Sequence, residues 1–139
     1  MSKLGLWRSD LALILLACFL PPAAAAVDSV LSPSSVEIVV TQRAFTPDTL
    51  DLRRGEPVTL VIRNEDEGLH AFVPLLLFLR TNVQIAGNSA PEFNETGFAR
   101  ALIPPHGKVE LRFTPQTIGN FSYICDLPGH VMRGEIHIR

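Results

Sequence analysis

The sequence predicts an all-β domain that folds as a β-sandwich and follows an export leader. Three observations support this prediction. Apolar residues repeat with a period of two in several short segments, turn-forming residues separate these segments, and the first residues of the chain have the composition of a signal peptide. The chain has 139 residues, a suitable length for one such domain after the leader is removed.

Residues 1–26 are predicted to be a signal peptide. Lys3 and Arg8 form a basic start, and a short apolar run is followed by the small residues of a cleavage site. The run is too short to cross a bilayer, so we expect export to the periplasm or another extracytoplasmic space. The alternative is a lipoprotein, because "LLAC", ending at Cys18, loosely resembles a lipobox. Membrane association is expected only if Cys18 is lipidated.

The folded domain is expected to span residues 36–139, after a lead-in at 27–35. Three segments alternate apolar and polar residues as half-buried strands do: "VEIVV" (36–40), "PVTLVIRN" (57–64) and "KVELRF" (108–113). Segments rich in proline, glycine and asparagine separate them. About six to eight short strands at this spacing indicate a β-sandwich.

Two segments depart from the alternation. Residues 79–100 contain glycine and proline without a sustained period, so we expect a long connection with room for one short helix. Residues 73–78, "VPLLLF", form a continuous apolar run that favours a strand buried on both faces. The alternative for this run is an apolar surface that extends a docking patch.

The net charge says little about the function of the protein, whereas its cysteine content says more. The formal net charge is −2, and such a weak balance predicts no binding to nucleic acid. Cysteine usage is more informative, because exported domains normally pair their cysteines and Cys125 stands alone once Cys18 is removed. Such a cysteine forms an intermolecular disulfide, stays inert in the core, or is held as a thiolate.

The direction of the Cys125 side chain follows from the last strands. We expect residues 108–113 and 119–125 to form an antiparallel hairpin. Phe121, Tyr123 and Cys125 then share one face. The two aromatic residues belong in the core, so the thiol points inward.

Cys125, His130 and Met132 place a thiol, an imidazole and a thioether on one short segment, "CDLPGHVM". A thiolate, imidazoles and a weak thioether at one centre suit copper, which changes between cuprous and cupric states. A trigonal site needs a second imidazole from elsewhere in the fold.

Three further histidines could supply this imidazole. His137 points away from the core in the terminal strand "GEIHIR", and His106 lies in a Pro-Gly turn, where a solvated side chain is the usual case. His70 lies where a strand ends in polar turn residues and the chain resumes as an apolar strand, which returns it to the same end of the sandwich. His70 is therefore the best candidate.

These motifs resemble those of the cupredoxins, the blue (type 1) copper proteins. "NEDEGLHAF" and "FTPQTIGNFSYICDLPGH" carry the resemblance, which covers nearly all of residues 36–139. It implies a Greek-key β-sandwich with one mononuclear copper ion, bound by His70, Cys125 and His130. Asn64 is expected to tie the His70 segment to the ligand loop by hydrogen bonds, unless it is an ordinary turn residue.

Met132 departs from the family pattern. Azurin-like proteins place a methionine four residues after the second histidine, plastocyanin-like proteins five and oxidase subunit II three, whereas Met132 follows His130 by two. We expect Met132 to be the weak fourth ligand. The alternatives are a backbone carbonyl or no ligand in that position, with Met132 as a core side chain. The binuclear centre of oxidase subunit II needs two cysteines, and Cys125 is alone.

The expected function is electron transfer and not catalysis, because such a site leaves no obvious open position for a substrate. The expected partner is a redox protein, such as a c-type cytochrome or an oxidase or reductase. It would dock transiently on the apolar surface of Leu127, Pro128 and Gly129 around His130. We expect a monomer. Two alternatives stay open: a copper carrier or resistance protein, and a copper enzyme or sensor with an open coordination position, for which His106 is the residue to watch.

Overall fold

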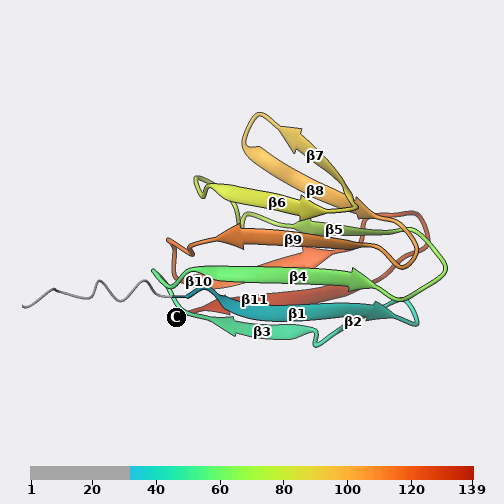
Figure 1. Ribbon diagram of the computed structural model, residues 1–139, viewed down its shortest axis with the longest axis horizontal. Helices are drawn as coiled ribbons and strands as arrows, with labels where there is room; N and C mark the ends of the chain where they lie inside the picture. Colours follow the sequence, from blue (N-terminus) through green and yellow to red (C-terminus); the bar gives the residue numbers. More distant parts are fainter. Residues whose placement is uncertain (1–31) are drawn as a thin grey trace, which may run out of the picture.

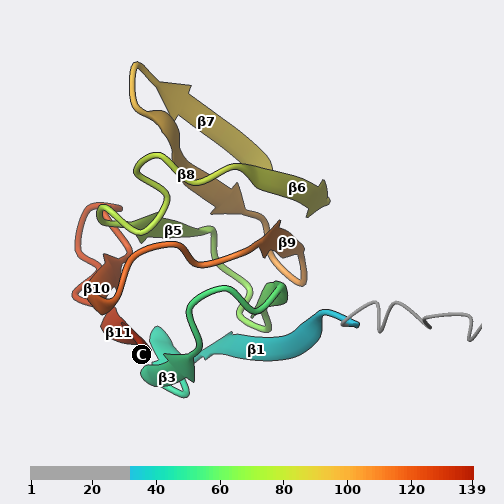
Figure 2. The same ribbon diagram turned by 90° about the vertical axis from the view of Figure 1, so that its left-hand side faces the viewer.

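The computed structural model describes residues 32–139, which form two β-sheets packed face to face (Figures 1 and 2). These residues contain eleven strands and no helix. Within them, accordingly, no helix is long and apolar enough to span a membrane. The expected all-β, Greek-key β-sandwich is confirmed. The predicted signal peptide and Cys18 lie outside the described residues.

Five strands form the first sheet and confirm the alternation expected in three segments. Side chains along β1, β4 and β9 alternate between buried and more exposed positions. β1 begins at Ser34, earlier than expected, because Ser34 pairs with Val58 in parallel register. The strands of this sheet, in spatial order, are β2 (Ala44–Thr46), β1 (Ser34–Thr41), β4 (Val58–Asn64), β9 (Lys108–Phe113) and β6 (Val83–Gly87).

Six strands form the second sheet. In Figure 2, β10, β11 and β5 lie on one side of the core, and β1, β9 and β6 lie on the other. The β7–β8 hairpin projects beyond the body of the sandwich in both views. The strands of this sheet, in spatial order, are β3 (Thr49–Leu52), β11 (Arg133–Ile138), β10 (Gly119–Ile124), β5 (His70–Pro74), β8 (Gly97–Ile103) and β7 (Ala90–Asn94).

The expected hairpin between residues 108–113 and 119–125 is wrong. β9 pairs with β4 and β6, whereas β10 pairs with β11 and β5, so the chain crosses from one sheet to the other between them. The inward direction of Cys125 is nevertheless confirmed, because Tyr123 and Cys125 are both buried. Side-chain alternation along β10 depends on which face meets the core, and not on which strand is its partner.

Residues 79–100 form strands and not a connection with a helix. β6 pairs with β9 along its length, and β7 and β8 form a hairpin. All residues of β7 are exposed, so no apolar alternation marks this strand in the sequence. Edge strands with two solvated faces are difficult to recognise from hydrophobic periodicity for this reason.

The apolar run at 73–78 is also not a continuous strand. β5 ends at Pro74, and the chain then turns. Leu75 and Leu76 are 45% and 72% exposed in this turn, while Leu77 and Phe78 are buried. The expectation of a strand buried on both faces is therefore wrong, and part of the run forms an apolar surface.

Tyr123 is the largest fully buried side chain of the core and fixes β10 next to the cysteine. Its ring lies 5.0 Å from that of Phe45 and 5.2 Å from that of Phe72, measured between centroids. Its hydroxyl donates to the backbone carbonyls of Pro47 and Asp48, at 3.2 Å each. Gly134 lies directly opposite Tyr123 in the β10–β11 ladder. A Cβ atom at Gly134 would overlap the tyrosine ring and hydroxyl.

Gly134→Ala is therefore expected to lower the free energy of unfolding by about 2–3 kcal/mol, in the upper part of the range for overpacked cores. The tyrosine cannot move away, because its ring is enclosed by two aromatic neighbours and its hydroxyl is bonded. Chemical denaturation measures the loss. Gly68→Ala is the control, because the space around Gly68 is open. Equal stability of the two variants would contradict this account of the core.

Four loops gather at one end of the sandwich, to the right in Figure 1: those that follow β1, β4, β8 and β10. Backbone hydrogen bonds join three of them. Glu65 N–H donates to the Val40 carbonyl, and Asn64 N–H donates to the Gly107 carbonyl, at 2.8 Å each. This loop end carries the candidate site, and the C-terminus lies at the opposite end.

Candidate metal centre

Three side chains singled out by the sequence converge at the loop end. One donor atom from each of His70, Cys125 and His130 lies within 4.8 Å of the others. His70 is the first residue of β5, and the other two belong to the loop between β10 and β11. The fold therefore brings together a thiol and two imidazoles from separate parts of the chain.

Cys125 is 3% exposed, and hydrogen bonds hold both its sulfur and its backbone in place. The backbone N–H of Ala71 donates to its Sγ at 3.3 Å, and Sγ lies 3.2 Å from Nδ1 of His130. The N–H of Cys125 donates to the carbonyl of Met132 at 3.1 Å, which closes the loop. These hydrogen bonds hold the sulfur in a fixed position inside the protein, and a thiolate at this position could bind a metal.

His70 is 1% exposed, and its two ring nitrogens have different surroundings. Nε2 lies 3.0 Å from Oδ2 of Asp66. Nδ1 is buried and has no hydrogen-bond partner among residues 32–139. Leaving a buried polar atom without a partner costs free energy, and native structures rarely do so without a reason. A metal ion bound to Nδ1 would supply the missing partner.

His130 is half-buried. Its ring lies 4.9 Å from that of His70, between centroids, at an interplanar angle of 51°. Burial lowers the pKa of His130, and the charge of Arg43 acts in the same direction, while the charge of Asp66 opposes them. A neutral imidazole has a free nitrogen lone pair, which a metal ligand needs.

Met132 is buried, at 5% exposure, and lines a surface cavity of about 630 Å³ together with Cys125 and His130. The loop between β10 and β11 thus places the thioether residue next to two of the converging side chains. This position is consistent with a fourth ligand and also with a side chain that fills the core, the two roles expected from the sequence.

The remaining histidines lie outside this group. His106 is solvated, with its side chain 62% exposed and its Nε2 lying 3.2 Å from Glu67. His137 lies at the surface of β11, 3.2 Å from Glu135. The surface position expected for His137 and the solvated turn expected for His106 are confirmed.

Asn64 is fully buried and organises the loop end. Its Nδ2 donates to the carbonyls of Gly68 at 2.8 Å and Pro104 at 2.9 Å, and its Oδ1 accepts from the N–H of Asp66 at 2.9 Å. The expected hydrogen bonds are present, but their partners differ from the expectation. Asn64 ties the His70 segment to the chain just after β8, and not to the loop that carries Cys125.

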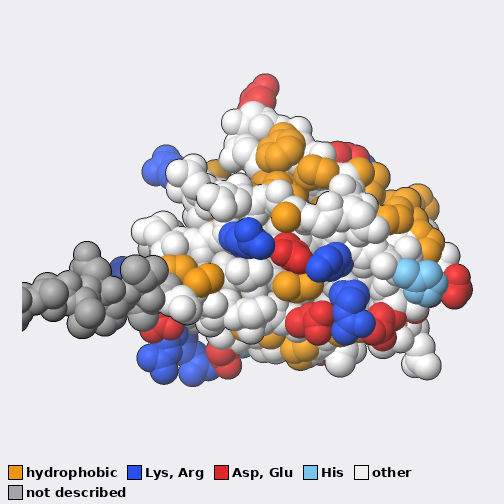
Figure 3. Space-filling view, viewed as in Figure 1, with side chains coloured by type: hydrophobic (Ala, Val, Ile, Leu, Met, Phe, Trp, Pro, Cys, Tyr) orange, Lys and Arg blue, Asp and Glu red, His pale blue; other side chains and the backbone are white. Residues whose placement is uncertain are grey.

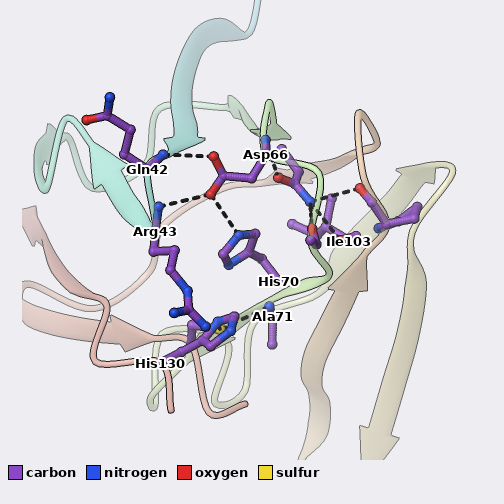
Figure 4. A network of polar contacts seen from close by, with 11 residues as sticks. Gln42, Arg43, Asp66, His70, Ala71, Ile103 and His130 are labelled. Carbon is purple, nitrogen blue, oxygen red and sulfur yellow. Dashed lines mark hydrogen bonds and ion pairs between the residues drawn. The ribbon is translucent and has the colours of Figure 1, made fainter. Parts of the chain in front are cut away.

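Asp66 is the residue of the site that sequence reasoning missed. Its carboxylate accepts from the backbone N–H groups of Gln42 and Arg43 and contacts His70 (Figure 4). The hydrogen bond from Arg43 N–H is the main cause of a lowered Asp66 pKa, with those from Gln42 and His70 adding to it against desolvation. The available signal was an aspartate four residues before the candidate histidine, but acidic residues are common in turns and this one does not stand out.

Apolar side chains lie beside His130 at the surface, where Arg43, Asp66 and Glu67 also line a pocket with it. Val131 is 89% exposed and Leu69 is 44% exposed, while Leu127 is half-buried and Pro128 is exposed. We call these four residues the apolar rim. Figure 3 shows hydrophobic side chains gathered toward this end of the molecule. The rim is wider than the expected surface of residues 127–129, because the loop before β5 adds Leu69.

The donor set determines which metal the residues could hold. One thiolate and two imidazoles, with a thioether nearby, form a mixed soft and intermediate set that suits copper. A structural zinc site would be completed by four firm ligands, usually cysteine or histidine. Only three such side chains converge within residues 32–139. The residues present therefore fit copper. The unpartnered Nδ1 of His70 is a nitrogen atom that is free to bind the ion.

Comparison with known proteins gives matches at the level of family and fold. The family model described as a cupredoxin-like domain matches residues 11–138 of the chain. Among solved structures, auracyanin A, a "blue" copper protein of the green thermophilic photosynthetic bacterium Chloroflexus aurantiacus, is similar at 20% identity with a TM-score of 0.58. The match covers 78% of this chain and 100% of that one.

Two further structures show the same fold. Dithionite-reduced auracyanin from the photosynthetic bacterium Roseiflexus castenholzii is 16% identical, with a TM-score of 0.57 over 78% of this chain and 98% of that one. A variant of amicyanin in its Cu(I) state is 14% identical, with a TM-score of 0.50 over 76% of this chain and 82% of that one. By sequence, no curated protein matches the chain.

Proposed function

Because the chain belongs to the cupredoxin-like domain family, we propose that it is an exported mononuclear type 1 copper protein that carries single electrons between redox partners. The observation that carries the proposal is the convergence of His70, Cys125 and His130, with a buried Nδ1 that lacks a partner. The solved structures with the same fold include proteins described as "blue" copper or as reduced Cu(I) proteins, which supports the choice of metal.

Copper bound at this site would supply the one-electron change between Cu(II) and Cu(I). The chain's own residues hold the ligands in place before any metal arrives. Asp66 restrains the His70 ring, Ala71 N–H restrains the sulfur, and the Cys125–Met132 backbone bond restrains the loop. Ligands held by a packed sandwich move little when the charge of the centre changes, which favours rapid electron transfer.

Shielding of the ligands favours electron carriage over the alternatives. Both Cys125 and His70 are almost fully buried, so two of the three donors are shielded from a substrate, which would need an open position at the metal. A copper carrier would need ligands that a recipient could reach, and buried donors do not suit that role. We therefore propose that the protein is not an enzyme.

We propose that electrons enter and leave through His130, the most exposed of the three converging side chains. The apolar rim around it would let a partner dock with little desolvation of charge, as brief redox encounters require. The proposed partner is another redox protein, such as a c-type cytochrome or an oxidase or reductase, met by the protein as a monomer. We propose no role in nucleic-acid binding, because the net charge of −2 would not attract a polyanion.

The proposed location is outside the cytoplasm, delivered by the signal peptide at 1–26 and free of the membrane unless Cys18 is lipidated. The lone Cys125 is compatible with this location, because a cysteine that binds a metal needs no disulfide partner in an oxidising space.

We propose Met132 as the weak fourth ligand. In that role, Met132→Gln is expected to lower the reduction potential, because an oxygen donor favours Cu(II), and Met132→Leu is expected to raise it, because removing the donor favours Cu(I). Each tenfold change in the ratio of Cu(II) to Cu(I) affinity corresponds to about 59 mV. Protein-film voltammetry measures the shifts. Potentials that are the same in both variants and in the wild type would assign Met132 to the core.

Electron carriage itself is tested by voltammetry of the copper-loaded wild-type protein and by stopped-flow mixing with a c-type cytochrome. We expect a reversible one-electron couple and rapid electron exchange that slows in Val131→Asp, which places a charge in the apolar rim. Irreversible voltammetry with release of copper on reduction would instead favour the copper carrier.

A further inference from the structure

The carboxylate of Asp66 lies at the meeting point of three N–H groups. The backbone N–H of Gln42 donates to Oδ1 at 2.8 Å, that of Arg43 donates to Oδ2 at 2.9 Å, and Nε2 of His70 lies 3.0 Å from Oδ2. Figure 4 shows the carboxylate between the turn that carries Gln42 and Arg43 and the imidazole of His70. The Asp66 side chain is 19% exposed.

The turn that provides two of these donors has an unusual backbone. Gln42 and Arg43 link the paired residues Thr41 and Ala44 of β1 and β2, with φ angles of 52° and 56°. This left-handed, two-residue turn is normally built from asparagine and glycine. Other residues adopt this conformation at a steric cost, because Cβ comes close to the following carbonyl oxygen. The ionised carboxylate of Asp66 offsets part of this cost by accepting from both N–H groups.

These contacts define which ring nitrogen of His70 carries the proton. Backbone N–H groups can only donate, so both oxygens of Asp66 act as acceptors, and such hydrogen bonds favour the ionised carboxylate over the protonated one. Nε2 of His70 must then be the donor, and in a neutral imidazole the other nitrogen is an acceptor. Nδ1, the buried atom without a partner, is thus the nitrogen with the free lone pair.

Asp66 cannot easily move away from this position. The Asp66 N–H donates to Oδ1 of Asn64 at 2.9 Å, so the buried asparagine holds its backbone. The β1–β2 turn holds its side chain. The arrangement links a fixed negative charge to His70 through one hydrogen bond, next to the converging donors of the site.

We propose that Asp66 is a positioning residue for copper, which orients His70 with Nδ1 toward the metal and favours Cu(II) over Cu(I) through its negative charge. This inference rests on the proposed function. A carboxylate bonded to the far nitrogen makes the imidazole a more basic ligand, and a more basic ligand stabilises the more highly charged ion. The β1–β2 turn supplies no ligand. It influences the reduction potential of the copper because it holds the carboxylate of Asp66 in place.

The first measurement needs no metal. In the copper-free wild-type protein, imidazole ¹⁵N chemical shifts report the protonated nitrogen of each histidine. We expect His70 to be the Nε2–H tautomer at neutral and mildly alkaline pH. Detection of the Nδ1–H tautomer in the folded copper-free protein would overturn the proposal, whatever the colour of the copper-loaded form.

The second measurement compares Asp66→Asn with Glu67→Gln. Both substitutions remove one carboxylate charge, from adjacent positions, but among residues 32–139 the Glu67 side chain forms its one hydrogen bond with the solvated His106 and none with His70. We expect Asp66→Asn to weaken Cu(II) binding by about 10–100-fold, as loss of a partner of a ligand histidine commonly does. If Cu(I) binding is unchanged, the potential rises by about 59 mV for each factor of ten. Glu67→Gln should leave both quantities at the wild-type value.

The turn gives a second route if Asp66→Asn folds poorly. The double substitution Gln42→Asn and Arg43→Gly supplies the residues that this turn normally uses, and so removes its need for the carboxylate. Asp66→Asn is then compared with that double variant as its parent. A rise in potential relative to the parent supports the proposal.

The outcomes separate the two levels of inference. A strongly coloured copper site whose potential is equal in Asp66→Asn and Glu67→Gln would overturn the role of Asp66 and leave the copper site intact. A wild-type protein that binds no copper with intense colour would overturn the proposed function itself.

Discussion

Replacing Cys125 with serine is expected to abolish the intense visible absorption of the copper-loaded protein. That absorption comes from the bond between Cu(II) and a thiolate, and Cys125 is the one cysteine in residues 32–139. A hydroxyl is a hard oxygen donor that does not replace a thiolate at a copper site. Visible spectra of both proteins at equal copper content measure the effect.

The substitution is nearly isosteric, so its effect on folding should be small beside its effect on colour. Thermal unfolding of the copper-free proteins provides the control, with a loss of about 1–3 kcal/mol expected for burying a hydroxyl at this position. If Cys125→Ser lost both its fold and its colour, the experiment would not support Cys125 as a ligand. Persistence of the full absorption in Cys125→Ser would exclude Cys125 as the ligand and with it the proposed centre.

Asn64→Ala is expected to cause the largest loss of stability, about 3 kcal/mol. Its amide makes hydrogen bonds to two strand connections and is fully buried, so alanine leaves several backbone groups without partners. Each buried group left unpaired costs about 1–3 kcal/mol. Denaturant titration of the copper-free protein measures the loss.

Asn82→Ala is the matched control for this prediction, because Asn82 is exposed in the connection just before β6. Its change should stay within about 0.5 kcal/mol. If the two alanine variants were equally stable, the hydrogen bonds of Asn64 would not organise the loop end. Since Asn64 also holds the backbone of Asp66, we further expect Asn64→Ala to weaken copper binding.

The site was more predictable from the sequence than the edges of the fold. Cys125, His130 and His70 could be related because strand alternation and turn positions assign each of them to the same end of a sandwich. The positions of the histidines in strands and turns then narrowed the choice among them, and the structure brings His70 and His130 together with Cys125. Residues with specific chemistry and buried neighbours leave strong signals in a sequence.

Other features left weaker signals. β7 is exposed throughout, so it lacks the apolar period by which strands are recognised. β9 and β10 are consecutive and antiparallel, and only the pairing with β4 and β5 shows that they belong to different sheets. Asp66 acts through two backbone N–H groups of a distant turn, and backbone donors are the same in every sequence. Long-range strand pairing and contacts made by backbone groups could therefore be found only in the structure.

The central claim is tested most directly by titrating the metal-free wild-type protein with Cu(II) and recording the visible and electron paramagnetic resonance spectra at each addition. We expect intense visible absorption that grows linearly and stops at one copper per chain, with the narrow copper hyperfine splitting of a thiolate-bound site. A weakly coloured protein with the broad hyperfine splitting of tetragonal copper would contradict a centre built from His70, Cys125 and His130.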